Sequence, residues 1–428
     1  MIAGQLQRAC FLIDRLNPAH YDRHQIGGLM ARLYPLRPKD IQMRKFTEEQ
    51  HMFRDAYRRF LADEVAPRMD EFREAGIVDR EIFKKAGDQG FLMVWPDEKY
   101  GGMADNDFRY EQIIIEETAR AGCAEWYNTL HSRLVGPYLK NIGNEEQRER
   151  FLPKCVSGET ILAVAMTESG AGSDLSGMKS MAKDMGDHWL LNGSKTYISN
   201  GINADVVIVA AKIDGVDDKH AMVLLILERG MEGFERGKNL EKIGLHAQDT
   251  AELFFNDVKI PKENTLGTPG KGFVHLMEGL AEERLIAMVG YAASARRAFD
   301  VTRAFVMDRD VFGKKLSDMQ NTQFKMAEMD AKIDMLQVYV DHCVDIHNQG
   351  GLNANIAAKG KMLGSEIEWE MADLGLQLHG GAGYMKEYEI SRIFTDARMS
   401  RIYAGSSEIM RYIVGRDIFS QKYQSILD

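Results

Sequence analysis

The chain has 428 residues, of which 45% are hydrophobic and 28% are charged, as is ordinary for a folded globular protein. Its formal net charge of −10 argues against nucleic acid as the main partner, because neutralising phosphates requires clustered lysine and arginine. No apolar run reaches the roughly 18 residues that a transmembrane helix needs, so we expect no transmembrane segment.

The first 42 residues have two interpretations. Five arginines between Arg8 and Arg37 are interspersed with apolar residues, as in a segment that targets a protein to an organelle. Asp14, Asp22 and the scarcity of serine weaken that interpretation. We favour a plain N-terminal extension, or an upstream start with Met43 as the usual one. A transit peptide would instead place the protein in the mitochondrial matrix of a eukaryote.

Residues 43–159 are predicted to form an N-terminal helical domain. Apolar side chains recur there at steps of three and four residues, as the buried side of a helix requires. These stripes run through Phe53, Tyr57, Phe60, Leu61 and Val65, through Tyr110, Ile113, Ile114 and Glu117, and through Leu130, Leu134 and Leu139.

Residues 160–271 are predicted to form a middle β domain. Short runs of β-branched and aliphatic residues appear at Ile161–Met166, Val206–Ala210, Met222–Leu227 and Leu253–Phe255. Glycine and aspartate clusters separate these runs, and no segment between them predicts a helix long enough for a crossover. We therefore expect a compact antiparallel sheet or barrel.

Residues 272–428 are predicted to form a C-terminal helical domain. The helical spacing returns over Gly272–Met307, Thr322–Asn348, Ala354–Leu378 and Ser406–Phe419. The fold class is thus mainly α with a middle β domain.

The four cysteines lie far apart, at Cys10, Cys123, Cys155 and Cys343, and form no CxxC pair. This spacing does not support a structural zinc site, and we predict no metal site. A reduced, cytoplasmic setting fits the cysteines best.

A glycine-rich segment, Thr167-Glu168-Ser169-Gly170-Ala171-Gly172-Ser173, follows the first predicted strand. Glycine lets backbone amides approach a ligand closely, and the hydroxyl groups can bond to polar ring atoms or phosphate. The segment matches neither a P-loop nor the GxGxxG pattern. Taken alone, a glycine-rich segment of this kind is more often only a turn.

A second polar segment, Asn192–Gly201, contains Tyr197 and Ser199. Residues two apart on a strand point to the same side. Tyr197 is therefore suited to cover a flavin ring while Ser199 donates to a ring nitrogen. The simpler interpretation is a hairpin with a half-buried tyrosine.

Glu283 is an anomaly in the predicted helix Gly272–Met307. It follows Leu280 by three residues and precedes Ala287 by four, so it falls on the apolar side. Burial raises the pKa of a carboxyl group, as a general base near neutral pH requires. The alternative is a structural ion pair, with Arg284 for example. Glu282, about 100° of helix away, is the only close rival and should face another side.

Two later segments also stand out. Arg309, in Arg309-Asp310-Val311-Phe312-Gly313-Lys314, is suited to forked hydrogen bonds with phosphate oxygens. The segment Gln377–Gly383 ends a helix with three glycines, whereas a helix cap needs only one.

Taken together, these motifs resemble the acyl-CoA dehydrogenase family in order and spacing, over about residues 46–425. The resemblance implies an N-terminal helical domain, a middle β domain and a C-terminal four-helix bundle. It also implies FAD as the cofactor and, usually, a homotetramer.

The resemblance implies roles for individual residues. Thr167 resembles a flavin-contacting threonine, Ser173 the serine that touches both FAD and the pantetheine arm, and Tyr197 a position where many members carry tryptophan. Arg309, Phe312 and Gln320 match residues that bind the FAD of a neighbouring subunit. The remaining implied FAD contacts are Met166, Gly172, Ser199, Gln377, Leu378, Gly380, Gly381, Ser406 and Glu408.

The catalytic base departs from the commoner family pattern. Many members carry glutamate directly before the glycine of a Tyr-x-Gly element, but here Tyr403-Ala404-Gly405 has alanine. Members of the isovaleryl and long-chain types carry the base in a Glu-Arg-Leu context on the earlier helix, as in Glu283-Arg284-Leu285. The resemblance thus implies Glu283 as the base, with Ser173, Arg284 and Gly405 as substrate contacts.

The implied reaction is the α,β-desaturation of a fatty acyl-CoA, with long chains favoured, to the trans-2-enoyl-CoA. An electron-transferring flavoprotein is the implied electron acceptor. Two alternatives are a flavin oxidase or monooxygenase of the same fold, and a non-catalytic acyl-CoA-binding protein. Neither alternative has a sequence feature in its favour.

Overall fold

The computed structural model describes Arg44 and residues 46–421. The chain divides into two compact units, Met1–Thr47 and Glu48–Asp428, and the second contains all of the described helices and strands. Both interpretations of residues 1–42 lie outside the described residues, as does Cys10. The three predicted domains stay a prediction, because Glu48–Asp428 clusters as one unit.

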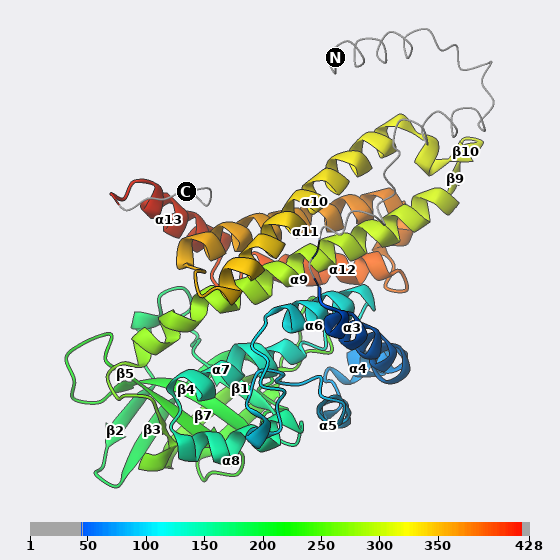
Figure 1. Ribbon diagram of the computed structural model, residues 1–428. Coiled ribbons are helices and arrows are strands. Elements are labelled where there is room, and N and C mark those ends of the chain that lie inside the picture. Colours follow the sequence, from blue (N-terminus) through cyan, green and yellow to red (C-terminus); the bar gives the residue numbers. More distant parts are fainter. Residues whose placement is uncertain (1–43, 45, 422–428) are drawn as a thin grey trace. The chain divides into compact units, whose positions relative to one another are not determined.

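The N-terminal part of the second unit is helical, as predicted. Its helices are α3 (Glu48–Phe60), α4 (Met69–Ala75), α5 (Arg80–Asp88), α6 (Arg109–Arg120), α7 (Gly136–Ile142) and α8 (Glu145–Val156) (Figure 1).

Local sequence signals set the boundaries of these helices. α8 begins with a capping box, in which Asn144 and Gln147 each accept a hydrogen bond from the other's backbone amide. Before α7, the chain forms a π-helical segment, Leu130–Val135. This segment carries Arg133, whose Nε lies 2.5 Å from Glu282 Oε1 on a later helix.

The middle part forms one eight-stranded sheet. Its strands are β1 (Leu162–Ala165), β2 (Met181–Asp184), β3 (His188–Ser199), β4 (Val206–Ile213), β5 (Met222–Glu228), β6 (Phe234–Asn239), β7 (Thr250–Pro261) and β8 (Thr265–Leu266). The order across the sheet is β6-β7-β3-β2-β4-β5-β8, with β1 beside β4.

The expectation of a purely antiparallel sheet is wrong in part. β4 pairs in parallel with both β1 and β2, whereas the other pairings are antiparallel. The connection from β1 to β4 contains the β2–β3 hairpin instead of a crossover helix. The lack of crossover helices in the sequence therefore does not exclude parallel pairing here.

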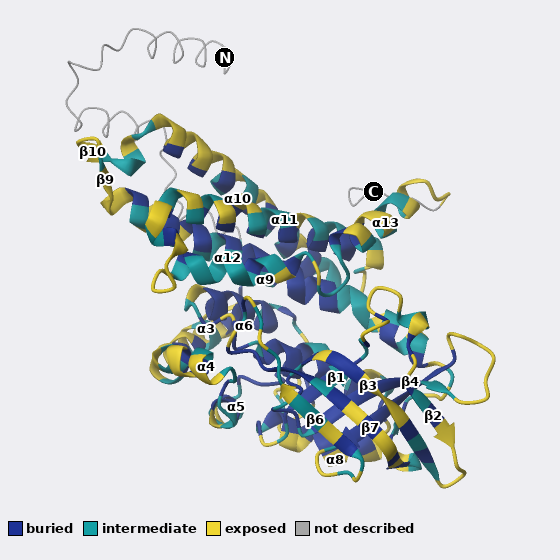
Figure 2. Cartoon of the chain, turned by 180° about the vertical axis from the view of Figure 1, so that it is seen from behind, coloured by how far each residue is buried: buried dark blue, intermediate teal, exposed yellow. Residues whose placement is uncertain are grey.

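Both sides of the central strands are buried, which explains their continuous apolar runs. On β4, Ile208 and Ala210 belong to a core cluster that contains Phe151 and Leu152 of α8. The alternate residue Val209 packs in a second cluster, with apolar side chains of β3 and β7. Figure 2 shows this burial in the strands.

The C-terminal part is again helical. It contains α9 (Gly272–Asp308), α10 (Gln320–Asn348), α11 (Ala354–His379), α12 (Glu389–Ser400) and α13 (Ser407–Ile418), with a small hairpin of β9 (Asp310–Val311) and β10 (Lys314–Lys315). α9 packs against α6, α10, α11 and α12, and α11 packs against α10, α12 and α13 (Figure 1).

α12 is not among the predicted helices, although its sequence carries a helical apolar stripe. Ile390, Ile393, Phe394 and Ala397 recur there at steps of three and four residues. Ile390 and Ala397 are buried, and Ile393 and Phe394 are half-buried.

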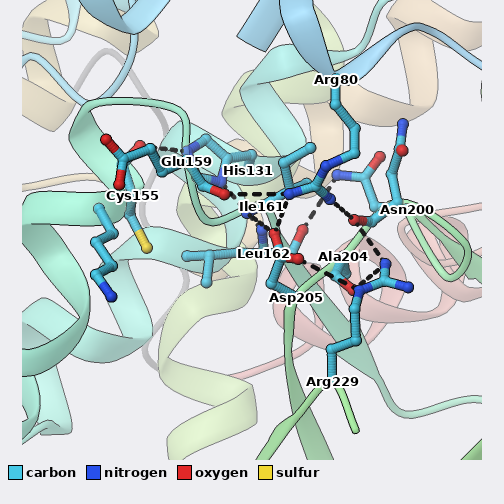
Figure 3. Close-up of polar contacts among 12 residues, drawn as sticks. Arg80, His131, Cys155, Glu159, Ile161, Leu162, Asn200, Ala204, Asp205 and Arg229 are labelled. Atoms are coloured by element: carbon cyan, nitrogen blue, oxygen red, sulfur yellow. Dashed lines mark hydrogen bonds and ion pairs between the residues drawn. The ribbon is translucent and has the colours of Figure 1, made fainter. Parts of the chain in front are cut away.

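A polar junction joins the N-terminal helices to the sheet (Figure 3). Asp205, directly before β4, accepts hydrogen bonds from Arg80 Nη2 (2.7 Å), Arg229 Nε (3.3 Å) and the Ile161 amide (2.9 Å). Arg80 begins α5, Ile161 precedes β1, and Arg229 follows β5. The Asp205 carboxylate therefore connects these three segments to the start of β4.

Within Arg44 and residues 46–421, no helix combines the length and the apolar character that crossing a membrane requires. The same residues contain no group of three or more His, Cys, Asp or Glu side chains placed to hold a metal ion.

Candidate active site

Glu283 lies on α9 and is 7% exposed, as its position on the apolar side predicts. Its Oε1 accepts a hydrogen bond from Tyr138 Oη of α7 at 3.1 Å. Burial raises the pKa of Glu283 to about 7, against the lowering effects of the Tyr138 hydrogen bond and the Arg284 charge. This is the pKa of a general base that operates near neutral pH.

Arg284 is also buried, but the alternative of an ion pair with Glu283 is not what the structure contains. Among the described residues, no ion pair joins Arg284 to Glu283, and the buried Arg284 Nε has no hydrogen-bond partner. Burial lowers the pKa of Arg284 from its ordinary value, and the nearby Glu283 charge opposes this effect. An unpartnered buried donor beside a carboxylate suits contact with a polar substrate group.

Glu282 faces a different side of α9. Besides its contact with Arg133, its Oε2 lies 3.7 Å from His347 Nε2 of α10. The two neighbouring glutamates therefore have separate partners, and the geometry favours Glu283 as the base.

Lys361 of α11 holds the loop that carries Gly405 by hydrogen bonds to its backbone. Lys361 Nζ is buried and donates to the carbonyl oxygens of Ser400 (2.8 Å) and Gly405 (2.7 Å). Ala404 and Gly405 have φ values of +54° and +87°, so the backbone is turned sharply there. The loop next to the predicted substrate contact is thus held in one conformation by a buried cation.

The glycine-rich turn is held by a buried ion pair. Lys195 Nζ on β3 lies 2.8 Å from Glu168 Oε1 and donates to the Met166 carbonyl at 3.0 Å. The Thr196 amide donates to the Thr167 carbonyl at 2.9 Å. These contacts fix the turn against β3, next to Tyr197.

The outer side of the turn is open. Gly172 and Ser173 are exposed, whereas Met166 and Thr167 are half-buried. A Cβ atom on Gly172 would meet no atom of the described residues within 4 Å. The turn therefore presents backbone and a hydroxyl group to a space large enough for a ligand.

Tyr197 is exposed, which contradicts the interpretation as a half-buried hairpin tyrosine. Its side chain is 67% exposed, and its φ is +59° at an irregularity in the β3–β7 pairing. Ser199, two residues on, is half-buried. A positive φ is strained for a non-glycine residue, and such strain concentrates at ligand sites.

A pocket of about 360 Å³ lies where α11 ends. It brings together Arg309, Gln377, Leu378, Gly380 and Gly381. Phe312 and Gln320 do not line it. Phe312 is instead 99% exposed, and Gln320 begins α10.

Ser406 and Glu408 lie at the start of α13. Ser406 caps this helix, because its Oγ accepts a hydrogen bond from the Ile409 amide at 3.3 Å. The Glu408 side chain is exposed.

These surfaces fit FAD in two places. The exposed ring of Tyr197 and the open turn beside it suit a flat ring system that stacks on an aromatic side chain. The pocket at the end of α11 combines glycine backbone with the guanidinium of Arg309, as binding of phosphate oxygens requires.

Three contacts of these sites were missed by the sequence pattern: Tyr138, Lys361 and the Glu168–Lys195 pair. Tyr138 lies 145 positions from Glu283 along the chain, and Lys361 lies 44 from Gly405. Lys195 had no local signal either, because it is flanked by the polar residues Ser194 and Thr196.

Comparison with known proteins yields three family models, which together cover most of the chain. The acyl-CoA dehydrogenase N-terminal domain matches residues 47–159, the middle domain 163–258, and the C-terminal domain 270–419. A mitochondrial long-chain specific acyl-CoA dehydrogenase from Sus scrofa is 42% identical over 90% of both chains.

Two solved structures show the same fold. An acyl-CoA dehydrogenase from Geobacillus kaustophilus is 44% identical, with a TM-score of 0.86 over 88% of this chain and 100% of that one. An acyl-CoA dehydrogenase complexed with FAD, from Bacillus anthracis, is 31% identical, with a TM-score of 0.81 over 90% of this chain and 68% of that one.

These matches confirm the predicted family, the mainly α fold with a middle β domain, and FAD as the cofactor. The chain therefore belongs to the acyl-CoA dehydrogenase family and is an FAD-dependent oxidoreductase.

Proposed function

We propose that this enzyme desaturates a long-chain fatty acyl-CoA between its α and β carbons, with Glu283 as the catalytic base. The observation that carries the proposal is the buried carboxylate of Glu283, which has a raised pKa and a single hydrogen-bond donor, Tyr138. The neighbouring carboxylate, Glu282, is instead held in an ion pair by Arg133.

Glu283 abstracts the α proton of the bound thioester. A carboxylate buried in an apolar site is a stronger base than one in water, because its charged form lacks solvation. The resulting negative charge on the thioester carbonyl needs donors, as in an oxyanion hole. The backbone of the Ala404–Gly405 loop, clamped by Lys361, supplies such a donor in the proposal.

FAD, when bound, supplies the two-electron acceptor that desaturation requires. We assign Met166, Thr167, Gly172, Ser173, Tyr197 and Ser199 to the flavin side. Ser173, Arg284 and Gly405 are assigned to the substrate. We assign the remaining FAD contacts to nine residues: Arg309, Phe312, Gln320, Gln377, Leu378, Gly380, Gly381, Ser406 and Glu408.

The partners and location are also part of the proposal. We propose an electron-transferring flavoprotein as the electron acceptor and a homotetramer as the assembly. A cytoplasmic location, or the mitochondrial matrix if residues 1–42 are a transit peptide, stays a prediction.

A panel of acyl-CoA substrates tests the proposal. Purified enzyme loaded with FAD is mixed anaerobically with butyryl-, octanoyl-, palmitoyl- and isovaleryl-CoA, and flavin bleaching and enoyl-CoA formation are followed. We expect the highest kcat/KM for palmitoyl-CoA. A maximum at butyryl-CoA would contradict the chain-length assignment.

The same experiment tests the two alternatives. Fast reaction of the reduced enzyme with oxygen would favour the oxidase or monooxygenase. Failure of every acyl-CoA to bleach the flavin would favour a non-catalytic acyl-CoA-binding protein.

A further inference from the structure

Tyr138 is the one side chain that donates a hydrogen bond to Glu283 among the described residues. It belongs to α7, whereas Glu283 belongs to α9, so the bond joins two helices. Tyr138 is 5% exposed and packs in a core cluster with Leu139 and Leu276. Its ring is therefore held in place by apolar packing, and its hydroxyl group points at a carboxylate.

The hydroxyl group of Tyr138 remains a donor at all relevant pH values. Burial raises the pKa of Tyr138 well above its ordinary value, and the Glu283 charge raises it further. A protonated phenol next to a carboxylate can only donate. Its hydrogen bond favours the charged form of Glu283 and opposes the effect of burial.

Gly279 leaves one side of this hydrogen bond open. It lies one helical turn before Glu283, and a Cβ atom there would lie 3.4 Å from Tyr138 Oη and 3.5 Å from Glu283 Oε1. Glycine inside a helix is less favourable than alanine. The space beside the two oxygens is thus maintained at a cost to helix stability, and Gly279 itself is half-buried.

Other ionisable groups lie near Glu283, but among the described residues the charges that shift its pKa come from its two neighbours on α9. The Arg284 charge lowers the pKa of Glu283 and the Glu282 charge raises it. Arg133 pairs with Glu282, and His347, whose pKa is lowered by burial, lies 3.7 Å from it. The further ionisable groups are Glu111 on α6, Tyr127 before the π-helical segment, and Lys361 on α11, and the charges of Arg133, Glu283 and Arg284 respectively act on their pKa values.

We propose that Tyr138 is a positioning residue, which holds Oε1 of Glu283 so that the other carboxylate oxygen is directed at the α carbon of the acyl-CoA. This inference rests on the proposed function of Glu283 as the base. The Tyr138 ring, fixed between α7 and α9, sets the rotamer of the carboxylate before the substrate arrives. Gly279 leaves the adjacent space free for the acyl group.

The inference predicts a pH effect with a definite sign. Without the hydroxyl group, the charged form of Glu283 loses a donor, so the pKa of the base rises. Loss of a hydrogen bond to a charged group should move this pKa by about one to two pH units. In Tyr138→Phe, the acid limb of the pH–rate profile should therefore move to higher pH.

The experiment measures single-turnover flavin reduction by palmitoyl-CoA across the pH range in which Glu283 titrates. Tyr138→Phe should react about tenfold more slowly near pH 7 and recover only part of the rate at alkaline pH, because the carboxylate is then fully charged but no longer oriented. Tyr100→Phe is the matched control. It removes a tyrosine hydroxyl that donates to a surface carboxylate, Glu145, at 2.7 Å, and should leave the profile unchanged.

A near-isosteric replacement covers the case in which Tyr138→Phe does not fold. Incorporation of 3-fluorotyrosine at position 138 makes the hydroxyl group a stronger donor and should move the acid limb to lower pH. An acid limb that stays in place in either protein would overturn the inference. If Glu283→Gln also reduced its flavin at the normal rate, the proposed base itself would be wrong, so the two failures are distinguishable.

Discussion

Glu282 and Glu283 are neighbours on one helix, yet their surroundings give them different chemistry. Glu282 pairs with Arg133 and lies near His347, whereas Glu283 is enclosed with a tyrosine hydroxyl as its only donor among the described residues. An offset of about 100° around the helix accounts for this difference. The apolar spacing along α9 predicts that Glu283 is buried, because that pattern is local. It cannot predict Tyr138, which is brought there by the packing of α7 on α9.

The raised pKa of Glu283 should make wild-type enzyme less stable at neutral pH than a variant without the charge. The pKa is about 7 in the folded state against an ordinary 4.5, so between these values the folded state binds more protons than the unfolded state. Stability from this group is therefore present at low pH and lost as pH rises toward 7.

Glu283→Gln should remove this loss. Measured by thermal unfolding of FAD-loaded protein, the variant should be more stable than wild type above about pH 7, by up to roughly 3 kcal/mol. The two proteins should converge near pH 4.5. Equal stability at all pH values would mean that Glu283 is not buried as a charged group.

Single buried polar side chains connect elements that lie far apart in the sequence. Lys195 joins β3 to the glycine-rich turn, and Lys361 joins α11 to the Gly405 loop. The spacing of apolar residues along the sequence predicts most of the helices and strands, because that spacing depends only on residues within one element. The parallel pairing of β4 escapes this reasoning, since it depends on contacts between elements.

His131 makes the junction between α8 and β1 sensitive to pH (Figure 3). Its Nδ1 accepts from the Leu162 amide at 3.1 Å, and its Nε2 contacts the Cys155 carbonyl at 2.9 Å, as a donor in the neutral ring. Protonation of His131 would place the new N–H at Nδ1 directly against the N–H of Leu162. Burial lowers the pKa of His131 to about 4 from an ordinary 6.5.

The unfolded state therefore binds more protons than the folded state between these two pKa values. The stability contributed by neutral His131 should be complete above about pH 6.5 and decline as pH falls toward 4. His131→Gln, which can accept and donate without titrating, should show a smaller loss of stability in this window. Urea unfolding of both proteins as a function of pH checks this, and identical slopes would count against it.

At the scale of the whole molecule, the surface contains apolar side chains that no other described residue covers. Phe312 is 99% exposed at the β9–β10 hairpin, next to the pocket that Arg309 lines. The proposed homotetramer accounts for the exposed Phe312 and for the pocket at Arg309, because a neighbouring subunit would bring its FAD to this hairpin. The sequence motifs point to these residues, but a single chain does not contain the contact they would make.

Arg309→Ala should therefore weaken FAD retention and assembly together. FAD content per chain is measured by absorbance, and mass by light scattering. Arg303→Ala is the control, since Arg303 is an exposed arginine on the same helix and does not line the pocket. An Arg309→Ala monomer that keeps one FAD per chain would contradict the shared site.

The central claim is that Glu283 removes the α proton, and single-turnover flavin reduction tests it most directly. Glu283→Gln keeps the volume of the side chain and its hydrogen bond with Tyr138, but it removes the proton acceptor. With saturating palmitoyl-CoA under anaerobic conditions, flavin reduction should fall by about 10²–10⁴-fold or more, while acyl-CoA binding persists. Glu282→Gln, the neighbouring control, should keep most of the wild-type rate. Near-normal flavin reduction in Glu283→Gln would contradict the account.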